Sequence, residues 1–319
     1  YIRERTSKEY DRGVKVSKDY ATKAGDEAEK ARDYIEDKVR ENPLASIGIA
    51  FGLFCGVIDL SVGSIMGVAA VVTGGLVSNV GLPTPLVIII ALIIGMLLGL
   101  VNGLLVTGLR IPSFIITLGT LALYRAVAER LQYDFYGSLR SQPFQNDTLL
   151  WIGSAEVIGR VPVSFWVFVC TALVAHIILA HTKIGIWFFG VGGNERAAFA
   201  AGVSPDRIRI AAFVISGLVA SMAGVVLTAR FQASLTATGT GFEFEAITAV
   251  IIGGASLFGG AGSIIGTILG VVLLRVLVNG LTHLDVVFYD QLLIRAGVFI
   301  LVLWVDATFR QRRRIAAGS

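Results

Sequence analysis

Long apolar runs separated by short polar stretches dominate the sequence after residue 43. A bilayer core about 30 Å thick needs ~20 apolar residues in a spanning helix, and ~17 lies near the lower limit. By this measure the pattern predicts an all-α, polytopic transmembrane helix bundle of about eight spans. The predicted spans cover residues 61–80, 84–108, 110–131, 163–182, 207–229, 241–259, 262–282 and 288–307.

A shorter apolar run, residues 42–58, precedes the first predicted span. It contains Gly48, Gly52 and Gly56, and each glycine weakens a helix. Either the run is a re-entrant half-span, or a span that belongs before it has been replaced. We expect it to be held by packing against the other helices rather than to form a stable helix alone.

The first 43 residues differ in kind from the rest of the chain. They hold 11 Lys or Arg and 11 Asp or Glu, which leaves only 16 and 12 for residues 44–319. Small apolar residues recur between these charges at steps of three and four, which predicts a charged amphipathic helix. We therefore divide the chain into a charged helical segment, residues 1–43, and a transmembrane domain, residues 44–319. The apolar stripe consists of Ala21, Ala24, Ala28, Ala31 and Ile35.

The composition agrees with a membrane protein and excludes several other classes. Charged residues make up 16% of the chain, against about 25% in soluble domains. The chain has no G-x-x-x-x-G-K-[ST] phosphate loop, and its three histidines lack metal-ligand spacing. We therefore expect no enzyme activity, catalytic residue, metal, cofactor or nucleic-acid partner. Cys55 and Cys170 lie in apolar runs and are interpreted as small core residues.

Lys and Arg residues are distributed unevenly between the two sets of connecting loops, and cytoplasmic loops carry the excess. One set carries nine and the other four, which predicts that the 183–209 loop and the C-terminus are cytoplasmic and that the 132–162 loop is outside. The first set is Arg110, Lys183, Arg196, Arg207, Arg209, Arg310, Arg312, Arg313 and Arg314; the second is Arg130, Arg140, Arg160 and Arg230.

A polar motif interrupts the apolar sequence at residues 56–64, where Asp59, Ser61 and Ser64 lie between glycines. Irregular backbone survives at membrane depth only where it is buried in protein or lines a cavity. The three residues are therefore candidates for the translocation path. A cytoplasmic loop with a solvated Asp59 is the alternative.

Helix formers from Glu195 to Ala201 occupy the predicted cytoplasmic loop and end at Gly202, a natural helix stop. Ser204 and Pro205 then resemble the cap and start of the next helix. This short exposed helix is either an ordinary interfacial helix or a knob that fits the groove of a partner. The candidate coupling residues are Asn194, Glu195, Ala197, Ala198 and Gly202.

Five glycines fall within the 11 residues 253–263, between two apolar runs. They indicate either close packing between helices or a discontinuous helix of the kind that lines substrate paths in transporters. In the second case Gly253, Gly254 and Ser256 are further candidates for the translocation path.

Charged residues inside spans are energetically expensive and are candidates for function. Glu129, Glu243 and Glu245 lie near span ends, where solvation explains them. Arg275 and Arg295 lie deeper and need a partner that the sequence does not identify.

Four motifs, in order over residues 51–309, resemble the permease subunit of ABC importers for simple sugars of the ribose and xylose type. They are residues 58–64, 193–202, 237–243 and 253–260. The resemblance implies translocation of a pentose or hexose across the bacterial inner membrane. It also implies a second permease copy, an ATP-binding cassette subunit docked on the 194–202 loop, and a periplasmic sugar-binding protein. Membrane lipid is the remaining expected partner.

The beginning of the chain departs from that resemblance. Permeases of this type have a complete first span and most of a second before the Asp59 motif. Here residues 1–50 resemble small tail-anchored, ribosome-associated inner-membrane proteins, through the run from Val39 to Ala50. An alternative function therefore stays open: a membrane-anchored interaction protein with a degenerate permease body.

Overall fold

The computed structural model describes residues 43–158 and 161–316. The predicted charged helix therefore lies almost wholly outside the described residues, and so does the beginning of the run from Val39 to Ala50 that carries the tail-anchor resemblance. The described part is all-α apart from four very short strands. Its helices are α2 (Pro43–Phe54), α3 (Val62–Gly75), η1 (a π-helical turn, Leu76–Val80), α4 (Thr84–Leu109), α5 (Ser113–Tyr136), α6 (Asp147–Ser154), α7 (Val163–His181), α8 (Lys183–Gly193), α9 (Glu195–Ala200), α10 (Pro205–Phe231), α11 (Phe242–Ile252), α12 (Ile264–His283) and α13 (Phe288–Ala316).

Within the described residues, six helical segments, not eight, are long and apolar enough to cross a membrane. The predicted span 110–131 is the helix α5, but its second half carries Arg125, Glu129, Arg130 and Asp134, which lower its hydropathy. The predicted span 241–259 is wrong, because α11 ends at Ile252 and non-helical chain follows. The six segments are Val62–Val80, Thr84–Leu109, Val163–His181, Pro205–Phe231, Ile264–His283 and Tyr289–Thr308.

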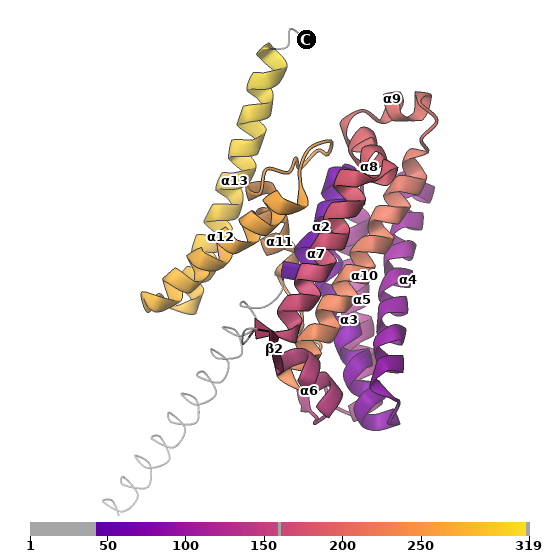
Figure 1. The fold of residues 1–319 in the computed structure, drawn as a ribbon, viewed down its shortest axis with the longest axis vertical. Coiled ribbons are helices and arrows are strands. Elements are labelled where there is room, and N and C mark those ends of the chain that lie inside the picture. Colours follow the sequence, from indigo (N-terminus) through magenta and orange to yellow (C-terminus); the bar gives the residue numbers. More distant parts are fainter. Residues whose placement is uncertain (1–42, 159–160, 317–319) are drawn as a thin grey trace, which may run out of the picture. The chain divides into compact units, whose positions relative to one another are not determined.

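Helix α10 is the centre of the packing and contacts α4, α3 and α2 (Figure 1). Every residue of α3 is buried, and so are the described side chains of α2. The apolar run 42–58 thus contains a helix that is covered by its neighbours. Cys55 is buried as predicted, whereas Cys170 is exposed on α7, so its assignment to the core was wrong.

The close approach of α4 and α10 depends on glycines. Gly95 and Gly99 recur four residues apart on α4, and each faces the backbone of α10. A Cβ atom on Gly99 would overlap the carbonyl oxygen of Phe213, and one on Gly217 would overlap that of Gly95. Small residues at this spacing are the usual means by which membrane helices bring their backbones together.

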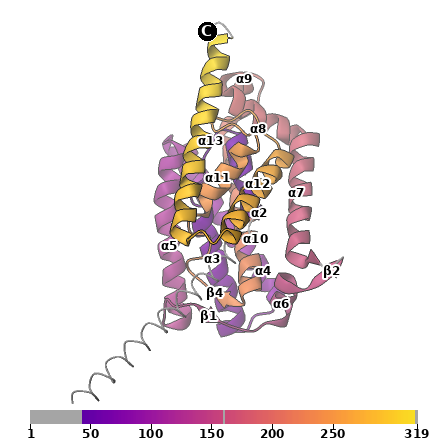
Figure 2. The same ribbon diagram turned by 90° about the vertical axis from the view of Figure 1, so that its left-hand side faces the viewer.

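Helices α11, α12 and α13 form a second group beside this core (Figure 2). Helix α11 packs against α12, α13 and α2, and α12 also contacts α7. Most of the surface of α12 and α13 is exposed and apolar, as in Leu269, Val276 and Leu293. These helices therefore present a wide apolar face.

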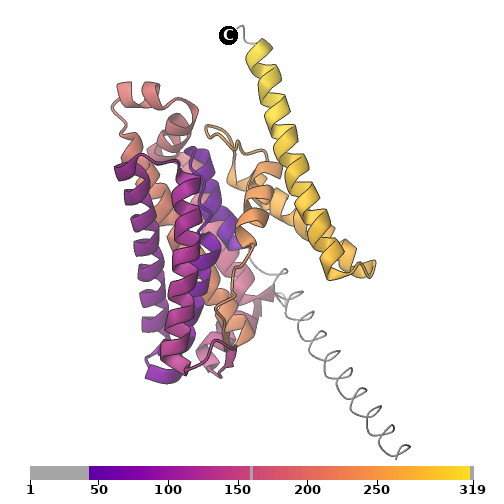
Figure 3. The same ribbon diagram turned by 180° about the vertical axis from the view of Figure 1, so that it is seen from behind.

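The loop helix α9 and the C-terminal end of α13 lie at the same end of the described bundle in all three views, and α6 lies at the other end (Figures 1, 2 and 3). The charge distribution predicts a common side for the first two. Two small antiparallel pairs are also present. Strand β1 (Gln142–Pro143) pairs with β4 (Ala233–Ser234), and β2 (Glu156–Ile158) pairs with β3 (Val161–Pro162). Which face is cytoplasmic stays a prediction.

Candidate functional site

Asp59 lies in the turn between α2 and α3 and is 1% exposed, so it is not a solvated loop residue. Its carboxylate accepts hydrogen bonds from the amide and hydroxyl of Ser61, at 3.0 and 2.7 Å. The hydroxyl of Ser216 on α10 donates the third, at 2.8 Å. A buried carboxylate is tolerated when its lone pairs are occupied in this way. Asp59 therefore fixes the start of α3 against α10.

The network continues through Ser61, whose hydroxyl accepts a hydrogen bond from the side-chain amide of Asn102 on α4, at 2.7 Å. The hydroxyl of Tyr124 on α5 lies 3.0 Å from Asn102 Oδ1. Ser64 is buried as well, and its hydroxyl donates to the carbonyl oxygen of Ser61 at 2.7 Å. Four elements, α3, α4, α5 and α10, are thus joined by one chain of polar contacts.

Sequence reasoning did not identify Asn102, Tyr124 or Ser216 as members of this site. The one indication in the sequence was Asn102, the single side-chain amide in the predominantly apolar helix α4. Buried polar groups need hydrogen-bond partners, so such a residue predicts that a partner exists. It does not predict which one, because Ser61 lies 41 residues away.

The glycine-rich segment 253–263 interrupts the helical structure between α11 and α12. Gly254, Gly259 and Gly260 have φ angles of 89°, 92° and 78°, a left-handed conformation that glycine adopts without steric penalty. Gly253 packs against the carbonyl group of Gly266, where a Cβ atom would overlap it. The segment is therefore a helix break and also a place of close packing, and its role in a substrate path stays a prediction.

Ser256 is 2% exposed and holds the turn within this segment. Its hydroxyl accepts a hydrogen bond from the amide of Phe258 at 3.2 Å, and its own amide donates to the carbonyl oxygen of Ala261 at 2.9 Å. The adjacent Phe258 side chain is 63% exposed. The hydroxyl of Ser256 is therefore used inside the turn, whereas Phe258 points out of it.

Three separate segments meet at a contact made almost entirely of backbone, which we call the glycine joint and define as Gly56, Gly192, Gly259 and Gly260. The amide of Gly260 donates to the carbonyl oxygen of Phe54 at the end of α2, at 3.0 Å. A Cβ atom on Gly259 would lie 2.8 Å from both the Cα atom of Gly192 and the amide nitrogen of Gly56. The joint thus connects the end of α2, the end of α8 and the broken helix. It also brings the Asp59 turn and the 253–263 segment together through backbone.

Helix α9 directly follows the glycine joint and agrees closely with the prediction, since it runs from Glu195 to Ala200. The side chain of Asn194 accepts the amide of Ala197 at 3.1 Å and caps the helix, and Gly202 adopts a φ of 85° at its end. Ser204 precedes α10 but makes no side-chain capping bond. The predicted boundaries are therefore correct, and the predicted capping bond is absent.

A bidentate ion pair fixes α9 on α10. The carboxylate oxygens of Glu195 accept from the two terminal nitrogens of Arg209, at 3.0 and 2.7 Å. Ala197 is exposed and Ala198 is half-buried, while the Phe199 ring is 71% exposed. The candidate coupling residues thus lie on a short, anchored helix that displays one aromatic ring at the end of the bundle.

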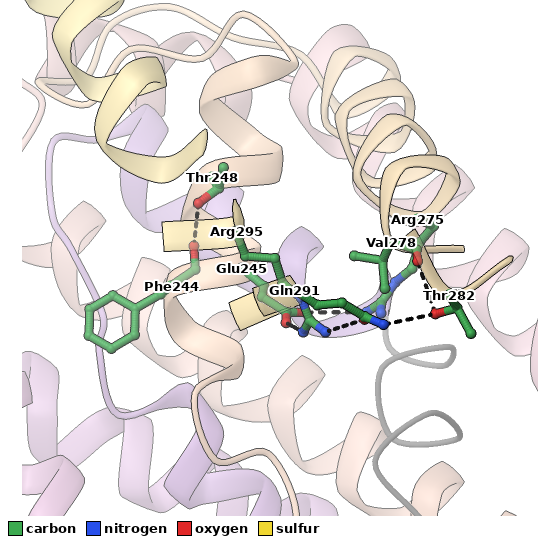
Figure 4. A network of polar contacts seen from close by, with 8 residues as sticks. All are labelled: Phe244, Glu245, Thr248, Arg275, Val278, Thr282, Gln291 and Arg295. Carbon is green, nitrogen blue, oxygen red and sulfur yellow. Dashed lines mark hydrogen bonds and ion pairs between the residues drawn. The ribbon is translucent and has the colours of Figure 1, made fainter. Parts of the chain in front are cut away.

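Arg275 and Arg295, the two arginines deep in their predicted spans, both pair with Glu245 (Figure 4). Glu245 is therefore not the solvated residue at a span end that the sequence suggested. Arg295 Nη1 lies 2.6 Å from Glu245 Oε1, and Arg275 Nη2 lies 3.8 Å from Glu245 Oε2. Glu243 is also buried, at 6% exposure, so its assignment to solvent was wrong too. Glu129 is exposed, as the solvated interpretation requires.

Comparison with known proteins identifies the family. The pattern of the family described as "Branched-chain amino acid transport system / permease component" matches residues 43–303. The chain belongs to this permease family. It begins to match within the run that the sequence interpretation assigned to a tail anchor, and no comparison supports the ribosome-associated resemblance of residues 1–50.

Individual relatives agree with this assignment. The chain is 34% identical to the ribose import permease protein RbsC of Haemophilus influenzae over 266 residues, which covers 83% of this chain and 81% of the relative. The RbsC of Escherichia coli K12 gives 34% identity with 82% of its length covered. The autoinducer 2 import system permease protein LsrC of Photorhabdus luminescens is 35% identical over 268 residues, 84% of this chain and 78% of the relative. No solved structure matches the chain. This permease is a multi-pass protein of the bacterial inner membrane.

Proposed function

We propose that this permease is the translocating subunit of an ATP-driven importer for a simple sugar, such as a pentose or hexose. The relatives named above import ribose or autoinducer 2 and resemble this chain over more than four fifths of its length. The family description names branched-chain amino acids, but the two kinds of relative support a sugar or a similar small polyhydroxylated compound. The permease moves this substrate without converting it.

The observation that carries the proposal is the connection between α9 and the broken helix. Helix α9 is capped by Asn194 and tied to α10 by Glu195, exposes Phe199, and follows Gly192 with only two residues between them. Gly192 contacts Gly259 and Gly260 in the segment between α11 and α12. A displacement of α9 by an ATP-binding cassette subunit would therefore reach the broken helix through the glycine joint. This is the arrangement that an ATP-driven permease needs.

The proposed translocation path passes beside the 253–263 segment, and Gly253, Gly254 and Ser256 shape it. Because the polar groups of Asp59 and Ser61 are already occupied, we assign them, with Ser64, to holding the start of α3 beside that path. The remaining proposed partners are a second permease copy, a periplasmic sugar-binding protein and membrane lipid.

The test is association with a two-cassette ATPase of a sugar importer, measured by copurification from membranes. We expect Glu195→Arg to reduce association at least tenfold, because it places two positive charges together at residues 195 and 209. Gly202→Pro should act similarly, since proline cannot adopt the φ of 85° found there. Both variants should still insert into the membrane.

Arg140→Glu is the matched control, since Arg140 is exposed at the other end of the bundle. It should copurify like the unmodified chain. Equal copurification of all three variants would remove the coupling role from α9. Complete absence of ATPase association in the unmodified chain would instead favour the membrane-anchored interaction protein.

A further inference from the structure

A cavity of about 230 Å³ lies between α11, α12 and α13, and of its lining only Gly241 and Phe242 belong to the four sequence motifs that carry the permease resemblance. Its walls are mainly apolar and aromatic, with Phe242, Phe244 and Phe299 among them. Glu245, Arg275 and Arg295 supply its charged groups (Figure 4). The cavity is thus an apolar space with a small ionic cluster in its wall.

The charges of this cluster do not balance. Two guanidinium groups share the single carboxylate of Glu245, which leaves one positive charge. The buried Nε of Arg295 has no hydrogen-bond partner within the described residues. An unbalanced cation among apolar side chains is destabilising, and a monoanion placed beside the two arginines would correct it. The ring of Phe242, 5.9 Å from the guanidinium of Arg275, offsets this charge only in part.

The position of the cluster indicates the source of such an anion. Arg275 lies eight residues before the end of α12 and Arg295 seven residues after the start of α13, so each is about 10–12 Å along its helix from the turn that joins them. With that turn at the membrane surface, the cluster lies at most about 10–12 Å deep, roughly a third of the way into a bilayer core about 30 Å thick. The neighbouring faces of α12 and α13 expose Leu269, Val276 and Leu293. A ligand for this place therefore needs an anionic group and long apolar chains.

We propose that the cavity binds the phosphate group of an anionic phospholipid, with its acyl chains along the exposed apolar faces of α12 and α13. Arginine forks bind phosphate oxygens in pairs, and the headgroup charge of −1 balances the cluster. This site requires the membrane location of the chain but not sugar import or ATPase association. Failure of the proposed function would leave it intact.

The test is lipid retention by the full chain, purified in detergent with equimolar phosphatidylglycerol and phosphatidylcholine and examined by native mass spectrometry. We expect the chain to retain phosphatidylglycerol about tenfold more than phosphatidylcholine. This is the affinity difference that a single charge-assisted hydrogen bond typically produces. Inorganic phosphate at the same concentration should not displace it. Equal retention of both lipids, or displacement by inorganic phosphate or by ribose, would overturn the proposal.

Variants locate the site. Arg275→Gln should abolish the preference for phosphatidylglycerol, and Arg275→Lys should keep part of it because the charge remains. Arg130→Gln is the control, since Arg130 pairs with Asp134 on an exposed turn of α5. An unchanged preference in Arg275→Gln would place bound lipid elsewhere and refute the assignment. If that variant does not fold, the two-lipid and phosphate experiments on the unmodified chain still decide.

Discussion

The group α3, α4 and α10 and the group α11 to α13 handle membrane burial in opposite ways. In their most apolar windows, 78% of the α3 segment and 67% of α10 are buried inside the protein, compared with 6% of α13. Helices α4 and α12 are each 28% buried, so α4 packs on α10 with one face and keeps an exposed apolar face as α12 does. The first group buries neutral hydroxyl and amide groups around one carboxylate, and glycines bring its backbones together. In the second group an ion cluster lies beside a cavity, α11 is mostly buried, and α12 and α13 expose most of their apolar surface.

The difference separates a fixed part of the permease from an adaptable one. Satisfied polar networks and close backbone contacts specify a single arrangement, because any shift breaks several interactions at once. In the second group α11 and α12 are also joined closely, through Gly253, Gly266 and Gly270, but α13 is mostly exposed and its apolar area needs lipid or another subunit. We therefore expect α3, α4 and α10 to move as one body and the broken helix to move relative to it.

The strongest test of this comparison changes a glycine in each group. Gly99→Leu should prevent folding or destabilise the protein by about 3 kcal/mol or more, because its side chain would overlap the backbone of α10. Gly280→Leu on α12 should change little, since nothing lies within 4 Å of its Cβ position. Yield of monodisperse protein and thermal unfolding in detergent measure both. Equal tolerance of the two substitutions would end the distinction between the groups.

A smaller effect is expected at the ion cluster. Glu245→Gln leaves Arg275 and Arg295 without a counter-charge, and we expect a loss of about 2 kcal/mol, less than for a fully buried pair because Glu245 is 26% exposed. Glu129→Gln, at an exposed position, is the control. Added phosphatidylglycerol should make the loss smaller, since its anionic headgroup supplies part of the negative charge that Glu245 no longer provides. A Glu245→Gln protein as stable as the control would mean that the ion pair contributes nothing.

The smallest effect concerns one hydrogen bond to Asp59. Ser216→Ala removes one of its three donors and should destabilise the protein by about 1–2 kcal/mol, as expected for a bond to a buried charge. Ser221→Ala on the same helix is the matched control, because that hydroxyl bonds only to the carbonyl oxygen of Leu218 in its own helix. Thermal unfolding distinguishes the two. Identical unfolding temperatures would show that Asp59 does not depend on Ser216.

The sequence predicted the helices whose boundaries are set by local chemistry. Apolar length alone predicted α4, α7 and α12 to within a few residues. Helix α9 was predicted almost to the residue, because Gly202 and Pro205 limit it through their own backbone preferences. Helix α11 was predicted too long, since hydropathy counts Gly253 and Gly254 as membrane-compatible and takes no account of their backbone angles.

Long-range partners could not be predicted from one sequence. The motif around Asp59 was recognised, but Ser216 lies 157 residues away and is an ordinary serine in its own helix. Glu245 seemed solvated because it follows a loop, and only the packing of α13 brings Arg295, 50 residues later, into contact with it. Apolar periodicity indicates which elements form, whereas their mutual packing decides which charges meet.

The glycine joint has a consequence for how this chain tolerates variation. Gly56, Gly192, Gly259 and Gly260 contribute no functional group, yet an added methyl at three of them would collide with neighbouring backbone. A saturation scan of transport should therefore find these positions among the most restricted in the protein. The neighbouring Phe258, large and exposed, should accept many replacements. At this contact, what these four residues contribute is that they have no side chain to keep the backbones apart.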